Sequence, residues 1–412
     1  MKLKDLKDKK IIIVGFGREG KNTYKTLKKL FPLKGIALAD KNLILADEKE
    51  IYSGENYLEN IDKYDVIIKT PGIPYGQIKE KSGKAKITSQ TELFLENCPG
   101  KIIGITGTKG KSTTTTLIYK ILKDHFKNIK LVGNMGRPCL SYLLTAKPKD
   151  IFVFEMSCHQ LDHISKSPNI SVFINIYPEH LDYYRTFSKY FNAKKNISKF
   201  QNKNDFFVYN PKFEEIKNIK TKAHKIPFEE QSFFKKNIHE DSIAAAVVVS
   251  KIFGLTEKEI KKSIDNFKTL DSRIEFVGTF SGINFYNDSL ATIPEATIFA
   301  LNELKNIDTL ILGGLDRGIQ FTKLTDEIKK REINNIILFP NSDRKIYKEI
   351  KNEKINFFFT SKMKDAVQFA IKNTKRGGTC LLSPAAPSYN LFKNYKDKAN
   401  QFKKYLKNES KK

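Results

Sequence analysis

A glycine-rich segment at residues 104–116, GITGTKGKSTTTT, lies between a strand-like run, KII, and a helix-like run, LIYKIL. Its core is Gly110-Lys111-Ser112. In loops of this type the backbone amides cradle phosphates, the lysine reaches the terminal phosphates and a hydroxyl holds magnesium. The first glycine, Gly107, comes two residues later than in the common pattern. Because such a loop needs a strand before it and a helix after it, the segment predicts an α/β fold and favours ATP as the ligand.

A second glycine motif precedes this loop. Gly15, Gly17 and Gly20 follow the apolar run IIIV in GxGxxG spacing, and Asp40 ends another strand-like run. The pattern is typical of dinucleotide-binding turns, in which glycines let backbone amides approach a diphosphate at a helix N-terminus. Any nucleotide diphosphate fits it, and so does a strand–helix turn without a ligand. Taken alone, the motif would favour an NAD-dependent oxidoreductase.

Strand-like and helix-like runs alternate along all 412 residues, a length that exceeds one ordinary hydrophobic core. The alternation predicts three α/β domains. We place a Rossmann-like domain at residues 1–97, a central ATP-binding domain with a mostly parallel sheet at 98–270, and a second Rossmann-like domain at 271–412.

The net charge of +27 arises from lysines spread along the chain, and no zinc finger or RNA-binding aromatic motif accompanies them. We therefore expect no nucleic-acid partner, although a basic nucleic-acid-binding ATPase would explain the charge and the loop. No apolar run reaches the roughly 18 residues of a membrane helix, and the N-terminus lacks a signal peptide. We expect a cytoplasmic monomer without membrane insertion. The four cysteines form no CxxC pair, so they indicate neither a zinc site nor a disulfide framework.

The phosphate loop and its surroundings resemble the Mur ligases, the ATP-dependent amide-forming enzymes of peptidoglycan precursor synthesis. Within that family the chain looks most like the enzymes that add glutamate to UDP-N-acetylmuramoyl-L-alanine. The resemblance covers essentially the whole chain. Nine segments occur in the family order: KTPGIP, SQTELF, GNMGRP, FEMSCHQLD, NIYPEHLDYY, YFNAKKNI, FYNDSLAT, LGGLDRG and LLSPAAPSYNLFKNY.

The resemblance implies that ATP phosphorylates the substrate carboxylate and that the amine of glutamate then displaces phosphate. Catalysis of this kind consists mainly of positioning the reactants and neutralising phosphate charge. We therefore expect ATP, two Mg²⁺ ions, UDP-N-acetylmuramoyl-L-alanine and glutamate as ligands, with D-glutamate favoured.

The resemblance also assigns roles to particular residues. Glu155 ends the apolar run DIFVFE, His180 lies in YPEHLDYY, and Lys194 occupies the family position whose lysine is carbamylated by carbon dioxide. The expected catalytic residues are Lys111, Glu155, His180 and Lys194. The expected metal ligands are Ser112, Glu155, His180 and carbamylated Lys194.

The remaining expected contacts fall into two sets. The ATP contacts are Gly107, Thr108, Lys109, Gly110, Lys111, Ser112, Thr113, Arg273 and Asp288. The substrate contacts are Gly15, Gly17, Arg18, Asp40, Thr70, Gly72, Asn134, Ser157, Gln160, Arg317, Ser388, Tyr389 and Tyr395. Among these, Arg317 stands where the family places a cation near the incoming glutamate, and the segment with Ser388 would close over it.

The chain departs from the family pattern at three places. His159 replaces an apolar aromatic, which we interpret as a packing difference without a catalytic role. Leu290 replaces the lysine that follows NDS in the D-glutamate enzymes, and a branch with a similar apolar residue adds L-glutamate, which remains an alternative. Residues 237–246 keep His239 but lack the asparagines that contact adenine. Folylpolyglutamate synthetases are a further alternative, but their different first domain does not match the GxGxxG block.

Overall fold

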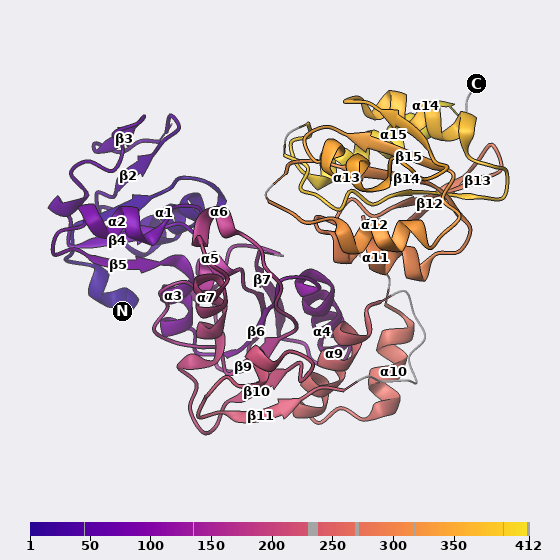
Figure 1. Cartoon of the computed structure of the whole chain (residues 1–412). Helices are drawn as coiled ribbons and strands as arrows, with labels where there is room; N and C mark the ends of the chain where they lie inside the picture. The colour runs from indigo at the N-terminus through magenta and orange to yellow at the C-terminus, as the bar shows by residue number, and fades with distance from the viewer. Residues whose placement is uncertain are drawn as a thin grey trace. The chain divides into compact units, whose positions relative to one another are not determined.

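The computed structural model describes residues 1–409 except 45, 135, 230–237, 268–271, 317 and 390. The chain divides into two compact units, Met1–Phe267 and Lys268–Lys412. Three sheets flanked by helices account for the alternation in the sequence, so the predicted α/β class is confirmed (Figure 1). The first unit contains two of the sheets. The blocks predicted at residues 1–97 and 98–270 therefore form one compact unit, and the boundary between them stays a prediction.

The N-terminal sheet has five parallel strands in the order β3-β2-β1-β4-β5. Its strands are β1 (Ile11–Val14), β2 (Ala37–Asp40), β3 (Ile51–Ser53), β4 (Val66–Lys69) and β5 (Lys86–Ser89). Its helices are α1 (Arg18–Leu30), α2 (Tyr75–Lys81) and α3 (Gln90–Asn97), with 3₁₀ helices η1 (Leu3–Leu6) and η2 (Ile61–Lys63). The strand order reverses between β1 and β4, and such a switch point opens a crevice at the carboxyl ends of the strands.

The central sheet has six parallel strands in the order β11-β10-β9-β6-β8-β7, as the mostly parallel prediction required. They are β6 (Lys101–Thr106), β7 (Ile129–Gly133), β8 (Ile151–Glu155), β9 (Ile170–Phe173), β10 (Phe206–Tyr209) and β11 (His224–Pro227). The helices are η3 (Leu140–Leu144), α4 (Lys111–His125), α5 (Cys158–Leu161), α6 (Leu181–Tyr184), α7 (Phe187–Lys199), α8 (Glu214–Lys217), α9 (Glu240–Ile252) and α10 (Glu257–Asp265).

Strand β6 is buried on both faces, which explains its continuous apolar sequence. Ile103 and Ile105 pack with the apolar face of α4, whereas Ile102 belongs to the cluster on the other side of the sheet, which includes Ile197 of α7. Each buried isoleucine stabilises the fold by about 1.5–3 kcal/mol relative to exposure. The two clusters hold α4 and α7 on opposite sides of the strand that leads into the phosphate loop.

The sheet of the second unit is mixed, in the order β12-β13-β17-β14-β15-β16, with β12 and β13 antiparallel. Its strands are β12 (Glu275–Phe280), β13 (Ile283–Asn287), β14 (Ile307–Gly313), β15 (Asn335–Phe339), β16 (Asn356–Phe359) and β17 (Thr379–Leu382). Its helices are α11 (Pro294–Glu303), α12 (Thr322–Lys329), α13 (Asp343–Ile350), α14 (Met363–Asn373) and α15 (Tyr395–Glu409).

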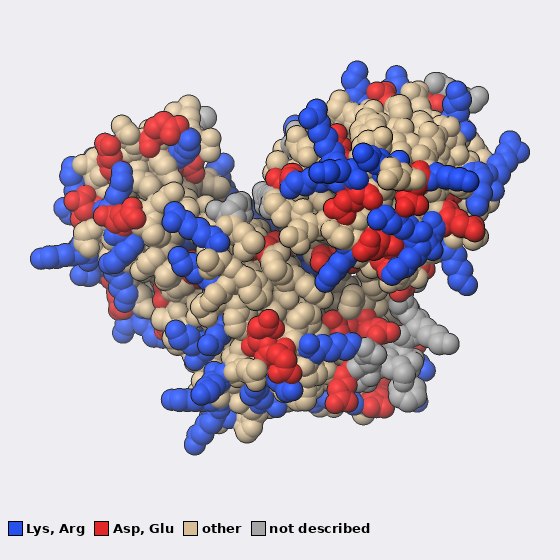
Figure 2. All heavy atoms as spheres, viewed as in Figure 1, with Lys and Arg blue, Asp and Glu red and all other residues tan. Residues whose placement is uncertain are grey.

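Positive charge is dispersed over the face of the molecule shown in Figure 2. On the face shown in Figure 2, Lys and Arg side chains are scattered over each unit with Asp and Glu among them, and they do not follow one continuous stripe. Within the part of the chain that the structure describes, no helix is both long and apolar enough to cross a membrane.

Lys398 on α15 is a buried lysine whose amine has no counter-ion within the described part of the chain. Its side chain is 0% exposed, and among the described residues its Nζ has no hydrogen-bond partner. The amine lies 5.2 Å from the ring centroid of Phe392 and 5.8 Å from that of Phe339. Burial lowers the pKa of Lys398 from 10.5 to about 7. Between these two values the unfolded chain binds the extra proton, so this group makes the folded state more stable as pH rises from about 7 to 10.5.

We expect Lys398→Met to raise the free energy of unfolding of the second unit by about 1–3 kcal/mol at neutral pH, because methionine keeps the apolar contacts and removes the unpaired amine. The gain should shrink towards pH 10, where the lysine is neutral in the folded state. Native-state hydrogen exchange of β15 amides measures it. Lys396→Met, on the exposed side of the same helix, is the control. An equal gain in both variants, or a gain independent of pH, would contradict the prediction.

Candidate active site

The phosphate loop connects the end of β6 to the start of α4. Gly110 caps the helix with φ of 79°, a left-handed conformation that favours glycine. The first amides of α4 therefore face the loop and, with the helix dipole, form an anion site. Lys111 Nζ donates to the backbone oxygens of Gly107 at 2.9 Å and Thr108 at 2.8 Å. The loop thus has the shape and charge to receive phosphate, as predicted from the sequence.

The loop is held from beneath by β9 and α7. Asn175, which follows β9, accepts from Lys109 N with its side-chain oxygen at 2.9 Å and donates to Lys109 O at 3.1 Å. Thr108 Oγ1 lies 3.0 Å from the hydroxyl of Tyr190. Sequence reasoning missed Asn175 as a loop-positioning residue. The available signal was a polar residue directly after the apolar strand ISVFI.

Glu155 ends β8 next to the phosphate loop, as predicted, because β8 pairs with β6 in parallel and Glu155 aligns with Ile105. The side chain is 1% exposed. Its Oε1 accepts from Asn134 Nδ2 at 2.8 Å, while Oε2 has no hydrogen-bond partner among the described residues. A buried carboxylate oxygen without a donor is costly unless a cation binds it. This is the first observation that fits magnesium.

The hydroxyl groups at the start of α4 are a second observation that fits magnesium. Thr113 Oγ1 is buried and, within the described part of the chain, has no hydrogen-bond partner. Ser112 lies beside it in the first turn and is partly exposed. Oxygen ligands from carboxylates and hydroxyls suit Mg²⁺, which keeps several waters and is held by few protein groups. The residues around the loop therefore fit magnesium.

Lys194 lies beneath the same loop. Its side chain is 1% exposed, and Nζ donates to Gly107 O at 2.8 Å and to Thr106 Oγ1 at 3.5 Å. Burial lowers the pKa of Lys194 to about 7, and the nearby charge of Lys111 lowers it in the same direction. A neutral amine is the form that reacts with carbon dioxide. The geometry thus supplies the chemical condition for the carbamylation implied by the resemblance.

His180 lies at the start of α6 with φ of 55°, and its imidazole is partly exposed. Its Nε2 is 3.8 Å from Glu179 Oε2. Glu179 also forms an ion pair with Lys109 at 2.8 Å. Burial raises the pKa of Glu179, but the charges of Lys109 and Lys111 outweigh it and hold the pKa at about 2. This carboxylate stays ionised and fixes the Lys109 side chain next to the loop.

The N-terminal crevice is formed by the turn after β1 and the turn after β4. A Cβ on Gly15 would lie 1.9 Å from Thr70 Oγ1, and one on Gly20 would lie 2.0 Å from Gly15 O. Packing therefore requires both glycines. In contrast, a Cβ on Gly17 or Gly72 would meet nothing within 4 Å. These two glycines leave open space in front of the backbone, which suits the close approach of a ligand.

Asp40, at the end of β2, orients this turn. Its Oδ2 accepts from Phe16 N at 2.5 Å, and its Oδ1 accepts from Asn42 N at 2.8 Å. A cavity of about 280 Å³ lies beside it. The lining residues are Phe16, Gly17, Lys21, Asp40, Asn42, Leu43 and Ile44. Two predicted substrate residues, Gly17 and Asp40, therefore line one cavity at the nucleotide-type turn.

Polar contacts connect the N-terminal sheet to the central sheet. Arg18 Nη2 donates to Gly133 O at 3.1 Å and to Asn134 O at 3.3 Å. Gln160 Nε2 donates to Glu19 Oε1 at 2.7 Å. Ser157 caps α5 through a reciprocal pair of hydrogen bonds with Gln160. The predicted residues Arg18, Asn134, Ser157 and Gln160 thus lie along the boundary between the two sheets.

Lys69 is a second residue that sequence reasoning missed. It ends β4 and is buried at the same boundary. Burial lowers the pKa of Lys69, while the charges of Asp162 and Glu19 oppose that shift. A lysine at the end of the apolar run VII was the available signal, because a buried strand end rarely carries a charge without a partner or ligand.

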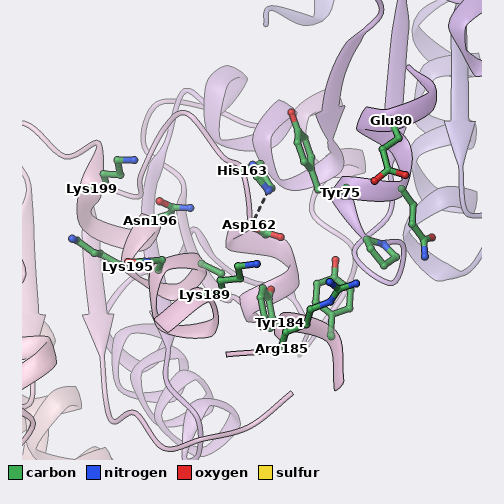
Figure 3. A pocket seen from close by; sticks show the side chains of 16 residues that line it. Tyr75, Glu80, Asp162, His163, Tyr184, Arg185, Lys189, Lys195, Asn196 and Lys199 are labelled. Carbon is green, nitrogen blue, oxygen red and sulfur yellow. Dashed lines mark ion pairs between the residues drawn. The ribbon is translucent and has the colours of Figure 1, made fainter. Parts of the chain in front are cut away.

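A larger cavity of about 900 Å³ lies on another side of α7. Its α7 residues include Lys189, Asn192, Asn196 and Lys199, which lie on the helix face opposite Lys194 at 100° per residue. Figure 3 shows the Lys189, Lys195, Lys199 and Arg185 side chains that line it, together with the Asp162–His163 ion pair. The cavity is therefore separated from the phosphate loop by the helix, and we assign it no part in the reaction.

In the second unit, Asp288 follows β13 and is buried. Its Oδ2 accepts from Ser383 Oγ at 2.8 Å and its Oδ1 from Ile274 N at 3.3 Å. Burial raises the pKa of Asp288 to about 7, while the charge of Arg273 opposes the rise. Asp288 and Arg273 are thus brought together. The carboxylate of Asp288 already has hydrogen-bond partners inside the second unit. The contacts of Asp288 and Arg273 with ATP stay predictions.

The residues predicted to contact the substrate glutamate differ in how deeply they are buried. Ser388 is buried, and within the described residues its Oγ has no hydrogen-bond partner. Tyr389 is 63% exposed, and Tyr395 begins α15. Arg317 lies outside the described residues. Leu290 is partly buried, and its backbone N donates to Ser272 O at 3.1 Å.

Comparison with known proteins identifies the family of this chain. Residues 105–292 match the Mur ligase middle domain model. The chain is 34% identical to the UDP-N-acetylmuramoylalanine–D-glutamate ligase of Ligilactobacillus salivarius, over 96% of this chain and 95% of the relative. It is 30% identical to the enzyme of the same name from Acetivibrio thermocellus, over 98% and 97%. The chain belongs to the Mur ligase family.

Solved structures agree with this assignment at the level of the fold. The MurF ligase of Thermotoga maritima, in complex with ADP, matches with a TM-score of 0.62 and 16% identity over 99% of this chain and 98% of that chain. The UDP-N-acetylmuramate–alanine ligase MurC of the same organism matches with a TM-score of 0.63 and 15% identity, over 97% and 99%. An oxidoreductase or a nucleic-acid-binding ATPase would not account for matches across nearly the whole Mur ligase chain.

Proposed function

We propose that this Mur ligase joins D-glutamate to the L-alanyl carboxylate of UDP-N-acetylmuramoyl-L-alanine, with ATP, in peptidoglycan precursor synthesis. The observation that carries the proposal is the 30–34% identity, over 96–98% of the chain, to relatives named UDP-N-acetylmuramoylalanine–D-glutamate ligase. The site agrees with it chemically. A phosphate loop, a buried carboxylate and a buried lysine meet at one sheet edge, as phosphoryl transfer to a carboxylate needs.

In the first step a carboxylate oxygen of the substrate attacks the γ-phosphorus of ATP, the β–γ P–O bond breaks and ADP leaves. The amide groups at the start of α4 and the amine of Lys111 would hold the transferring phosphoryl group. Lys111 already donates to two loop carbonyls, Gly107 and Thr108, so phosphate oxygens would take over its hydrogen bonds. ADP bound in the MurF structure of Thermotoga maritima supports ATP as the phosphoryl donor.

Magnesium would be held by Ser112, Glu155, His180 and carbamylated Lys194, as two ions. The Oε2 of Glu155, which has no hydrogen-bond partner among the described residues, supports this assignment, and the unpaired hydroxyl of Thr113 lies beside Ser112 in the same helical turn. When bound, magnesium neutralises charge on the phosphate oxygens. The hydrogen bond from Asn134 occupies Oε1 of Glu155, so Oε2 is the oxygen that would bind the ion.

In the second step the amine nitrogen of glutamate attacks the carbonyl carbon of the acyl phosphate. The C–O bond to phosphate breaks, inorganic phosphate leaves and the nitrogen loses a proton. We propose that the uridine diphosphate end of the substrate occupies the N-terminal crevice at Gly15, Gly17 and Asp40. Arg18, Asn134 and Gln160 would then follow its path towards the loop. We propose Arg317 and the Ser388 segment as contacts of glutamate.

The identity of the amino acid is the decisive experiment. With UDP-N-acetylmuramoyl-L-alanine and ATP, we expect product and ADP with D-glutamate at least about tenfold faster than with L-glutamate. Leu290 favours L-glutamate as the second candidate, because an apolar residue there cannot pair with the glutamate side-chain carboxylate. Product formation with L-glutamate but not with D-glutamate would refute D-glutamate as the substrate and support L-glutamate. No product with either enantiomer would refute both.

The variant Leu290→Lys tests whether the residue at position 290 selects between the enantiomers of glutamate. The added cation is expected to pair with the side-chain carboxylate of D-glutamate, and so to raise the D-to-L ratio of kcat/KM by about tenfold. Leu290→Met keeps an apolar side chain and is the matched control. A ratio unchanged by lysine would show that this position does not contact glutamate. We also propose a cytoplasmic location and a monomer, the latter testable by light scattering.

A further inference from the structure

A cluster of metal-binding side chains lies beside the phosphate loop. Cys158, His159 and His180 each offer one ligand atom, and these atoms all lie within 4.8 Å of one another. The first two residues begin α5, and the third precedes α6 (Figure 1). The fold brings them together because α5 follows β8 and α6 follows β9, and these strands flank β6 at the same sheet edge.

This cluster shares the His180 imidazole with the proposed magnesium ligands, but its other two donor atoms belong to Cys158 and His159. One sulfur and two imidazole nitrogens suit zinc-class ions such as Zn²⁺ and Co²⁺, whereas Mg²⁺ prefers oxygen. In a tetrahedral zinc site, metal–ligand distances of about 2.0–2.3 Å separate the ligand atoms by roughly 3.3–3.6 Å. A contraction of about 1 Å from the observed limit is within the reach of side-chain rotation. Three protein ligands leave a fourth position for water or a phosphate oxygen.

The surroundings orient the three groups. The rings of His159 and His180 lie edge to face with centroids 5.0 Å apart. Tyr184 stacks on His159, and its hydroxyl lies 3.4 Å from His159 Nδ1 and also hydrogen-bonds Cys158. Partners of this kind around metal ligands fix ring orientation. Cys158 is 2% exposed, while both imidazoles are partly exposed, so an ion has access from the solvent side.

We propose that Cys158, His159 and His180 bind one zinc-class divalent ion at a site separate from the oxygen ligands of magnesium. Binding does not depend on the proposed function. One consequence does: His180 is a proposed magnesium ligand, so an ion held by the cluster withdraws its imidazole and inhibits the ligase. The sequence alone obscures this site, since Cys158 lies in no CxxC pair and His180 is 22 residues further along the chain.

Cobalt is the probe of choice because thiolate coordination gives it a near-ultraviolet charge-transfer band. The full-length protein is stripped with a chelator and titrated with Co²⁺ in excess Mg²⁺. We expect one equivalent of Co²⁺ to produce the charge-transfer band and intense visible bands of a four-coordinate ion, and Zn²⁺ to displace it. Cys158→Ser should abolish the charge-transfer band. His159→Phe should weaken Co²⁺ binding at least about tenfold.

Cys98→Ser is the matched control, because Cys98 is a more exposed free thiol than Cys158. Its spectrum should equal that of the unaltered protein. Circular dichroism and thermal unfolding check that each variant is folded. A titration without a thiolate band would overturn the proposal, and so would a band that survives Cys158→Ser in a folded variant or disappears in Cys98→Ser.

Activity separates this proposal from the proposed function. Zinc at concentrations that displace cobalt should inhibit product formation, and folded Cys158→Ser and His159→Phe should resist that inhibition while retaining basal activity. Equal inhibition of all three proteins would overturn the inhibitory role. A protein that binds cobalt as described but ligates neither enantiomer of glutamate would retain the metal site and lose the proposed function.

Discussion

Lys111→Ala is expected to reduce product formation by at least about 10³-fold at saturating ATP. The amine of Lys111 lies at the loop carbonyls of Gly107 and Thr108, where the transferring phosphoryl group would be held. Removing a cation at the position where phosphoryl charge develops has effects of about 10³–10⁵ in comparable phosphoryl-transfer sites. Coupled measurement of ADP and of the ligated product reads the loss directly.

Lys123→Ala is the control for this experiment, because Lys123 is exposed in the last turn of the same helix, α4. It should retain activity within about twofold, since surface substitutions of this kind perturb little. The unfolding temperature of Lys111→Ala should remain near that of the unaltered protein. Near-normal turnover of Lys111→Ala at saturating ATP would refute the role proposed for its amine.

Lys194→Ala is expected to be nearly inactive and to recover partly when short carboxylic acids such as acetate are added. The alanine variant leaves a space beneath Gly107 O where the carbamate would supply an anion, and a small carboxylate can occupy it. Lys195→Ala is the control, since Lys195 points away from the loop towards the large cavity on α7. Full activity of Lys194→Ala, or equal stimulation of both variants by acetate, would contradict the carbamate.

The pH dependence provides an independent test of Lys194. Carbamylation consumes the neutral amine, and burial lowers the pKa of Lys194 to about 7. The bicarbonate concentration is adjusted at each pH so that the concentration of dissolved carbon dioxide stays constant. Under this condition the carbamylated fraction should rise as pH increases through about 7. Carbon-13 labelled bicarbonate should give a carbamate signal that is absent from Lys194→Ala. A labelled signal of equal size in both proteins would show that the carbamate lies elsewhere.

Several local features of the fold could be predicted because they depend on neighbouring residues. Gly110 must adopt a positive φ where β6 turns into α4, and that requirement is visible in the sequence. The buried strands of the central sheet read as continuous apolar runs because helices cover both of their faces. In contrast, β3 and β11 are short, partly exposed edge strands, and no apolar run marks them.

The site was predicted less completely, and the reason is the distance along the chain between its parts. The resemblance named Glu155 and Asn134 separately, but only the fold shows that one donates to the other. Asn175 and Lys69 escaped notice because each is one polar residue at the end of an apolar strand. Their importance follows from the neighbours that the parallel sheets bring to them.

The phosphate loop, the alternating α/β order and the resemblance to a ligase family could be recognised before the fold was known, because these properties reside in short contiguous segments. The environment of Lys194, in contrast, depends on packing between segments that are far apart in the chain. The amine of Lys194 donates to Gly107 O across 87 residues of chain, and burial there lowers its pKa to about 7. The tertiary structure also groups Cys158 and His159 with His180. Burial and ligand geometry are set by packing between distant segments, so no local pattern can express them.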